Sequence, residues 1–372
     1  DVVGTVDDPE DNLVSFTLIA TPFAGGPTTV LAEGTDEVIE DVLGEFDGTL
    51  LRNDSYILEL SAVDAGGNTA STSTLVDVEG DLKIGNYTLS FVDLSIPLTG
   101  IPIVVSRTYD TLNANVKDDF GYGWSMALRD TDLTDNVGKT GSEDVGVYNA
   151  FFDGAAVYVT LPNGEREKFI FQPQAQGLPG LTIYKPRFVA ADGDNTSTLT
   201  VDDIELRRRP DGRYETFSRI PYNPASTLIS DLNSGNYTLT TKDGIQYTID
   251  ANSGDLEKVT DRNGNTLTYT EGGVFSSTGK QVTFERDPQG RITAVIDPEG
   301  NRITYEYDAL GDLVAVTDRE GHTTRFDYND DIPHFLEDVI DPLGRNGIRS
   351  EYQDGRLVKL FDFDGNEVEL IH

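Results

Sequence analysis

The C-terminal third of the chain repeats itself with a period of twenty-one residues, and this repeat limits the folds that the chain can adopt. Gly279, Gly300 and Gly321 follow one another at that interval. The same interval separates further pairs, namely Asp297 and Asp318, Gly290 and Gly311, Tyr307 and Tyr328, and Asp341 and Asp362. A fixed period of this length indicates one supersecondary element per unit, and neighbouring units must stack because none buries its apolar face alone.

One complete unit spans residues 297–317 and has the pattern of two strands joined by tight turns. Its segments are a turn at 297–300, a strand at 301–307, a turn at 308–311 and a strand at 312–317. Aspartate bonds its own backbone in such turns, proline presets φ, and glycine accepts the left-handed conformation. Alternate strand residues share a face, so each unit adds an apolar, tyrosine-bearing row to a growing sheet. The residues expected to fix this structure are Gly300, Tyr305, Tyr307, Asp308, Gly311, Gly321, Tyr328, Gly344 and Tyr352.

The pattern Gly-x-x-x-x-Tyr-x-Tyr-Asp-x-x-Gly-x-Leu, which runs from Gly300 to Leu313, resembles the YD repeat of the Rhs family. That family includes bacterial polymorphic toxins, insecticidal toxin-complex C components and the animal teneurins. The resemblance implies that residues 244–372 form an antiparallel meander of hairpins that is part of an Rhs-like β-shell. Three departures stand out: Phe284-Glu285-Arg286 in place of Tyr-x-Tyr, Asp312 at a frequent Arg position, and Asp330 and Asp331 in place of Gly-Arg.

A β-rich region at 83–243 is expected to precede the repeats. A strand ending in Arg107-Thr108-Tyr109 and a Gly-aromatic-Gly turn before Trp124 resemble the entry region of Rhs-family proteins. We expect Trp124, the only tryptophan, to anchor the core.

Two further features of this region constrain its strands. Because proline cannot donate to a ladder, the strands beside Pro97 and Pro102 should lie at an edge or start just after the proline. Residues 173–198 are poor in strand pattern and are predicted to form a loop or insertion.

The N-terminal part, residues 1–82, shows strand alternation at 14–19 and 56–63 and suits a small sandwich. Its turn from Asp64 to Asn68 resembles one that closes a hairpin in bacterial Ig-like and cadherin-like modules, of which five or six strands would be present. The sequence therefore predicts an all-β chain. Its three parts would be an incomplete Ig-like sandwich at 1–82, an entry region at 83–243 and YD repeats at 244–372.

Charge and composition exclude several classes of partner and chemistry. The formal charge of −37 argues against nucleic acid, because a polyanion would be repelled. Residues 1–80 hold seventeen Asp and Glu against one basic residue, Arg52. The chain has no cysteine, so disulfides and thiolate chemistry are excluded. No apolar stretch approaches the ~20 residues of a membrane span, so no membrane insertion is expected. Strand-like sequence at both ends indicates a piece of something longer.

Catalysis near neutral pH would have only His322, His334 and His372 to use. Two of them fall in turns, and His372 is the final residue. His322 stands where sibling repeats have Asn or Arg, which favours a solvated turn histidine. A carboxylate pair chosen from sixty-five acids would carry no information. We therefore expect a chain that is not an enzyme.

Calcium is the cofactor for which the sequence offers candidate ligands, because Ca²⁺ binds carboxylate and amide oxygens on loops. The candidates are Asp7, Asp8, Glu10, Asp11, Asp64 and Asn68. The alternative is a solvated acidic face.

These features lead to the hypothesis of a structural or adhesive segment of a large Rhs/YD-repeat protein, secreted or held at the cell surface. Its expected partners are other regions of the same long chain or further copies of itself. Cell-surface carbohydrate is another candidate partner, although the repeat tyrosines recur at packing positions. Two alternatives stay open: a shell fragment that encapsulates a toxin for delivery, and a subunit of an extracellular fibre formed by strand addition.

Overall fold

The computed structural model describes residues 1–10, 12–23, 28–79, 83, 85–126, 129, 131–160, 166–178, 181–191, 197–229, 235–353, 355–362 and 364–369. These residues form strands joined by turns, which confirms the all-β prediction. Helical geometry in this part of the chain is limited to three short 3-10 turns, η1 (Gly48–Leu50), η2 (Thr111–Asn113) and η3 (Glu143–Val145).

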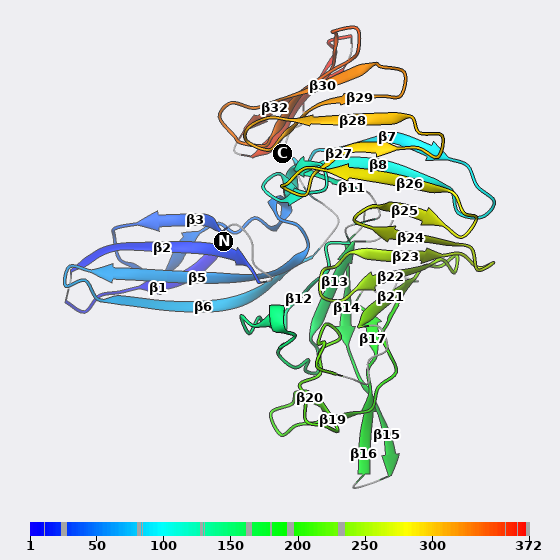
Figure 1. The fold of residues 1–372 in the computed structure, drawn as a ribbon. Coiled ribbons are helices and arrows are strands. Elements are labelled where there is room, and N and C mark those ends of the chain that lie inside the picture. The colour runs from blue at the N-terminus through cyan, green and yellow to red at the C-terminus, as the bar shows by residue number, and fades with distance from the viewer. Residues whose placement is uncertain are drawn as a thin grey trace.

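The largest element is an antiparallel sheet of 15 strands among the described residues, called the repeat sheet below (Figure 1). Apart from the step from β18 to β21, its neighbouring strands are consecutive in the chain, as in a meander of hairpins. It takes in β18 and β21, which precede residue 244. Its strands are β18 (Thr198–Thr200), β21 (Asn236–Thr240), β22 (Gln246–Asp250), β23 (Leu256–Thr260), β24 (Thr266–Thr270), β25 (Gly273–Ser276), β26 (Gln281–Arg286), β27 (Ile292–Ile296), β28 (Arg302–Tyr307), β29 (Leu313–Thr317), β30 (Thr323–Tyr328), β31 (Leu336–Ile340), β32 (Asn346–Gln353), β33 (Arg356–Phe361) and β34 (Glu367–Glu369).

The repeat produces this meander through its turns and its alternation. Gly300 and Gly311, at the two ends of β28, have φ values of 92° and 101°, a region that favours glycine. Along β28, Ile303 and Tyr305 are buried while Glu306 is exposed, so one face of each strand points into the core. One unit of twenty-one residues therefore supplies two strands and two turns.

A second, three-stranded sheet packs against the buried face of the repeat sheet. Its order is β11 (Trp124–Met126), β8 (Ile103–Asp110), β7 (Thr88–Ile96), and it is called the inner sheet below. β7 ends directly before Pro97 and β8 begins directly after Pro102, as the missing proline N–H requires. The short strands β9 (Lys117–Asp118) and β10 (Gly121–Tyr122) form the hairpin that precedes β11.

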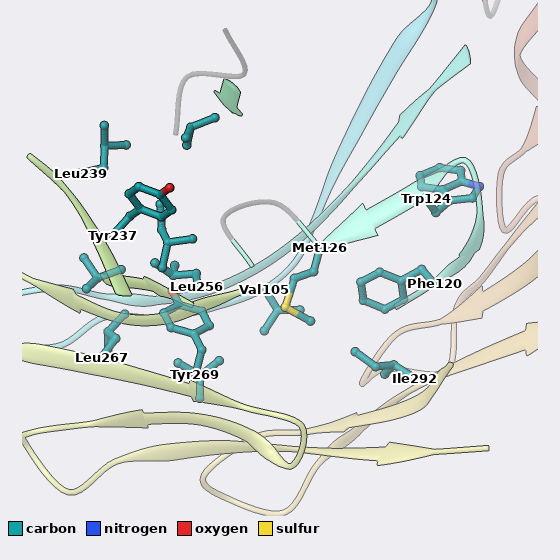
Figure 2. Packing of buried hydrophobic residues seen from close by; sticks show 14 of the residues in the cluster. Val105, Phe120, Trp124, Met126, Tyr237, Leu239, Leu256, Leu267, Tyr269 and Ile292 are labelled. Carbon is teal, nitrogen blue, oxygen red and sulfur yellow. The ribbon is translucent and has the colours of Figure 1, made fainter. Parts of the chain in front are cut away.

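The two sheets share one hydrophobic core, part of which appears in Figure 2. Val105, Phe120, Trp124 and Met126 from the inner sheet and its hairpin lie in the same cluster as Ile292 of β27. Trp124 is fully buried, which agrees with its predicted role as a core anchor.

Two small sheets lie between the inner sheet and the repeat sheet in sequence. One has the order β12-β13-β14-β17 and the other β15-β16-β19-β20. Their strands are β12 (Thr134–Asp135), β13 (Ala156–Thr160), β14 (Arg166–Phe171), β15 (Gln174–Leu178), β16 (Leu181–Lys185), β17 (Phe188–Ala190), β19 (Leu206–Arg208) and β20 (Tyr214–Thr216).

The loop predicted at 173–198 is wrong, because this stretch contains the β15–β16 hairpin, β17 and the start of β18. The hairpin projects from the body (Figure 1). The described side chains of residues 174–177 are all exposed. A strand without a buried face shows no alternation of polar and apolar residues, so the sequence pattern contains no signal for it.

The N-terminal module, residues 1–79, consists of two sheets that face each other. Four strands pair in the order β3-β2-β5-β6, and β1 pairs with β4. The strands are β1 (Val2–Val6), β2 (Leu13–Pro22), β3 (Thr29–Gly34), β4 (Val38–Gly44), β5 (Asp54–Asp64) and β6 (Thr69–Val78). A small core of its own, built on Val6, Phe16, Leu18 and Leu43, joins the two sheets. Its Ig-like character stays a prediction.

Candidate functional site

The repeat tyrosines tie each strand pair to the one before it. The hydroxyl of Tyr307 donates to the backbone oxygen of Ile292 at 2.6 Å, and that of Tyr328 donates to Leu313 at 2.9 Å. Tyr352 makes the matching bond to Leu336 at 2.7 Å. Each tyrosine follows a bulge in its strand, which aims the ring along the sheet.

These contacts also determine whether the repeat tyrosines are accessible to a carbohydrate ligand. Tyr305 is buried, and its hydroxyl donates to Asp93 at 2.8 Å. Burial raises the pKa of Tyr305, Tyr307 and Tyr328 above the ordinary value. Because these rings pack inside the protein, a sugar that stacks on an aromatic ring would have to bind elsewhere.

The aspartates that open the repeat turns act as local scaffolds. Asp297 Oδ1 accepts from the backbone N–H groups of Glu299 and Asn301, both at 2.9 Å. Its Oδ2 accepts from the Asn301 side chain at 2.8 Å and from Arg319 of the next unit at 3.0 Å. Burial opposes ionisation, but the hydrogen bonds of Asn301 and Arg319 outweigh it and lower the pKa of Asp297 to about 2.

A buried arginine joins the inner sheet to the repeat sheet. Arg107 on β8 is 2% exposed, and its Nε donates to Asp93 at 2.9 Å. Its guanidinium also lies 4.8 Å from the ring centre of Trp124 and 4.9 Å from that of Phe326 on β30. Burial raises the pKa of the Asp93 carboxyl. The charge of Arg107 and the hydrogen bond from Tyr305 partly offset this rise. The buried Arg107–Asp93 pair therefore contacts residues of both sheets, while Arg107 Nη1 is buried without a hydrogen-bond partner among the described residues.

Asp119 forms a second connection between the two sheets. Both of its carboxylate oxygens accept from Arg129, at 2.6 and 2.7 Å, and Arg286 of β26 donates to Oδ1 at 2.6 Å. The backbone oxygen of Asp119 accepts from Ile292 at 2.7 Å. The turn before β11 is therefore held to two successive strands of the repeat sheet.

Asp312, one of the departures from the repeat, pairs with His334 in the segment that follows Tyr328. The carboxylate of Asp312, which is 1% exposed, lies 2.8 Å from His334 Nδ1. The His334 ring stacks on Tyr122 with ring centres 3.9 Å apart, and its backbone oxygen accepts from Tyr109 at 2.8 Å. His334 therefore packs on Tyr122 and hydrogen-bonds to Asp312 and Tyr109. His322 is exposed beside Asp318, and His372 lies outside the described residues.

A buried charge cluster joins the N-terminal module to the rest of the chain. Asp54 is fully buried and accepts from Thr134 at 3.0 Å and from Arg166 at 3.3 Å. Arg52 donates to Asp132 at 2.8 Å. Burial, followed by the charge of Arg52, lowers the pKa of Arg166. Two acid–base pairs whose members are distant in sequence, Asp54 with Arg166 and Arg52 with Asp132, therefore lie at one interface.

Further charged contacts surround this cluster. Lys168 donates to Asp77 at 2.6 Å and to Glu79 at 2.7 Å. Arg356 of β33 contacts Asp47. In each of these contacts the acidic residue belongs to the N-terminal module and the cation to the rest of the chain, which matches the excess of acids in residues 1–80.

The calcium candidates are brought together only in part. Asp7, Asp8, Asp64 and Asn68 line one pocket of about 360 Å³ in the N-terminal module. Glu10 is exposed and accepts from Asn12 at 3.3 Å, and Asp11 lies outside the described residues.

Two observations argue against a cation bound in that pocket. The carboxylate of Asp64 already accepts from the backbone and side chain of Asn68, at 2.8 and 2.7 Å. In the described ranges, three candidate ligand atoms lie within 4.8 Å of one another at Asp318, Glu320 and His322, which are all exposed. Calcium therefore stays a prediction.

Comparison with protein families gives two matches. The family described as RHS Repeat matches residues 286–323 and 307–331. A domain of unknown function, DUF6531, matches residues 81–141, which include the inner sheet. The matched repeats are among those whose turns and tyrosines are described above, and this part of the chain consists of Rhs/YD repeats.

Comparison with solved structures gives the crystal structure of TcdB2-TccC3-TEV among its matches. The identity is 9% and the TM-score 0.25, and the alignment covers 82% of this chain and 22% of that chain. This chain therefore spans about a fifth of the length of that protein. Comparison with curated proteins gave no match. Within the described ranges, no helix has the length and apolar character needed to cross a membrane.

Proposed function

We propose that this chain is a non-catalytic wall segment of a large secreted or cell-surface Rhs/YD-repeat protein. The observation that carries the proposal is the single core shared by the inner sheet and the repeat sheet. A face filled by Trp124, Phe120 and Tyr109 is a packed interior. The coarser role, an Rhs-type structural segment, follows from the repeats themselves.

The edges of the repeat sheet support a role in a larger wall. Among the described strands, β34 pairs with β33 alone and β18 with β21 alone. Backbone groups at such edges hydrogen-bond to further strands. We infer that further repeats of the same long polypeptide are the natural partners of the β34 edge.

A truncated chain that ends at Lys242 tests this structural role. Trp124 is fully buried and packs on Phe326, with ring centres 5.3 Å apart. The proposal expects the truncated chain to lose native tryptophan fluorescence and near-ultraviolet dichroism, because the inner sheet loses its cover. A remainder that keeps both signals would contradict a shared scaffold. Turnover in a broad hydrolase screen of the whole chain would contradict the non-catalytic part.

The two alternatives differ in measurable ways. A toxin-delivery shell requires a cytotoxic domain and a self-cleavage segment in the rest of the parent protein, which sequencing of the reading frame would reveal. A fibre subunit that adds strands at its edges would associate with increasing concentration. A strictly monomeric profile in size-exclusion chromatography with light scattering would argue against the fibre.

A further inference from the structure

We propose that the N-terminal module binds an extended, positively charged peptide strand in the groove between β1 and the β5–β6 hairpin. The groove has a volume of about 360 Å³ and lies at the end of the module that contains the β5–β6 turn. Figure 1 shows this end pointing away from the repeat sheet, so a partner reaches it without disturbing the wall.

The module exposes one face of its larger sheet at this groove. Its larger sheet has four strands, whereas the described part of the opposing sheet has only β1 and β4. Residues 69–75 of β6 are exposed at every position, although a strand in a sandwich normally buries alternate side chains. Cross-strand pairing places Ala70 opposite Ala62 and Thr72 opposite Leu60, and all four line the groove.

Two strand edges border the same groove. Among the described strands, β1 pairs with β4 alone and β6 pairs with β5 alone. An added strand beside β1 would hydrogen-bond through its main chain and place alternate side chains over Leu13, Leu60 and Ala62. The geometry therefore selects an extended peptide with apolar residues at every second position.

The charge around the groove determines which kind of peptide strand would bind there. Asp7 and Asp8 lie at the β1 side of the groove, and Asp64 lies at the hairpin side. The module has a single basic residue in residues 1–80, Arg52, which is bound to Asp132. A second copy of this chain carries the same charge of −37 and would be repelled. A strand with Lys or Arg next to its apolar positions complements the rim.

Binding to the whole chain tests the proposal with a labelled peptide of about nine residues, the length of one strand. The probe alternates Val and Thr and has Lys at both ends; a matched peptide has Glu at both ends. We expect the Lys peptide to bind and to weaken by about tenfold or more between about 0.05 M and about 0.5 M salt, because exposed charges are screened. The Glu peptide should not bind.

Two substitutions on β6 assign the binding to the groove. Thr72→Trp fills the groove, whereas Ser73→Trp places the same ring on the opposite face of the exposed strand. The proposal expects Thr72→Trp to abolish binding and Ser73→Trp to retain it, with both variants unchanged in thermal stability. Equal binding of the two peptides, equal effects of the two variants, or no binding of the Lys peptide would overturn the proposal. So would self-association of the chain that Thr72→Trp removes, since the groove would then hold a second copy.

Discussion

Arg286 Nε donates a hydrogen bond of 2.9 Å to the backbone oxygen of Glu271. Twenty-one residues later, the hydroxyl of Tyr307 donates to the backbone oxygen of Ile292 at 2.6 Å. The donor and the acceptor are both displaced by one repeat, so arginine makes the bond that tyrosine makes in the other units. Arg286 departs from the sequence pattern but keeps the hydrogen bond to the backbone that the repeat tyrosines make.

This equivalence predicts how Arg286 tolerates substitution. Arg286→Tyr keeps a donor for the Glu271 oxygen, and Asp119 retains its bonds to Arg129, so the loss of unfolding free energy should be about 1 kcal/mol or less. Arg286→Met leaves the carbonyl without a donor and should cost about 2 kcal/mol or more. Urea denaturation of the two variants measures the difference. Equal losses of unfolding free energy would show that the hydrogen bond to the Glu271 carbonyl does not contribute to stability at this position.

Close packing between the inner sheet and the repeat sheet makes a second prediction. A Cβ at Gly121 would lie 2.4 Å from the backbone oxygen of Gly311, whereas one at Gly141 would meet nothing within 4 Å. Both glycines have positive φ, 92° and 78°, so alanine strains the backbone at either position. Gly121→Ala should destabilise by at least about 2 kcal/mol more than Gly141→Ala, because overpacking adds to the strain. Similar melting temperatures for the two variants would contradict the described contact.

The lowered pKa of Asp297 predicts how the stability of the folded chain falls at acid pH. The pKa of its carboxyl falls from the ordinary 3.8 to about 2 in the folded chain. A depressed pKa means that the folded state holds the proton less tightly, so the contribution is present above about pH 4 and is lost as the pH falls toward 2.

Asp297→Asn tests this contribution by comparison with wild type. The substitution should lower stability at pH 7 by roughly 1–2 kcal/mol, and the difference should shrink below pH 4. Asp330→Asn, at an exposed carboxylate, is the matched control and should have little effect at any pH. A pH-independent effect of Asp297→Asn would show that charge plays no part in the turn.

The charge cluster at the N-terminal module predicts that the module is held in one orientation. Arg166→Met removes a partner of the fully buried Asp54 and should loosen the interface by about 3 kcal/mol or more, because a buried charge loses compensation. Lys168→Met removes contacts to the partly exposed Asp77 and Glu79 and should cost about 1 kcal/mol or less. Small-angle scattering should show a broader distance distribution for Arg166→Met alone. Identical profiles would contradict a fixed module.

The repeat made much of the fold predictable. Turns such as the one at Gly300 depend on residues within five positions, and the burial of Ile303 and Tyr305 follows from their two-residue spacing. Local chemistry therefore determines the strands of the repeat sheet. Pro97 and Pro102 mark the ends of β7 and β8 for the same reason.

Contacts between distant segments were not predictable in this way. Asp54 and Arg166 are 112 positions apart, and one sequence contains no signal that links them. Asp312 and the segment after Tyr328 stand out as separate departures, but their pairing through His334 depends on a loop that the repeat does not specify. The hairpin at β15 and β16 is not predictable from alternation, because the described side chains of β15 at 174–177 are all exposed.

Hydrogen exchange measured by mass spectrometry on the whole chain tests most directly whether the inner sheet and the repeat sheet form one cooperative structure. The prediction is slow exchange shared by strands β26 to β31 and by β7 and β8, since Tyr109 and Trp124 of the inner sheet hydrogen-bond to Leu336 of β31 and Tyr328 of β30. The β15–β16 hairpin should exchange quickly. Uniformly low protection from Leu256 to Phe361, or protected repeats beside freely exchanging β7 and β8 strands, would contradict the account.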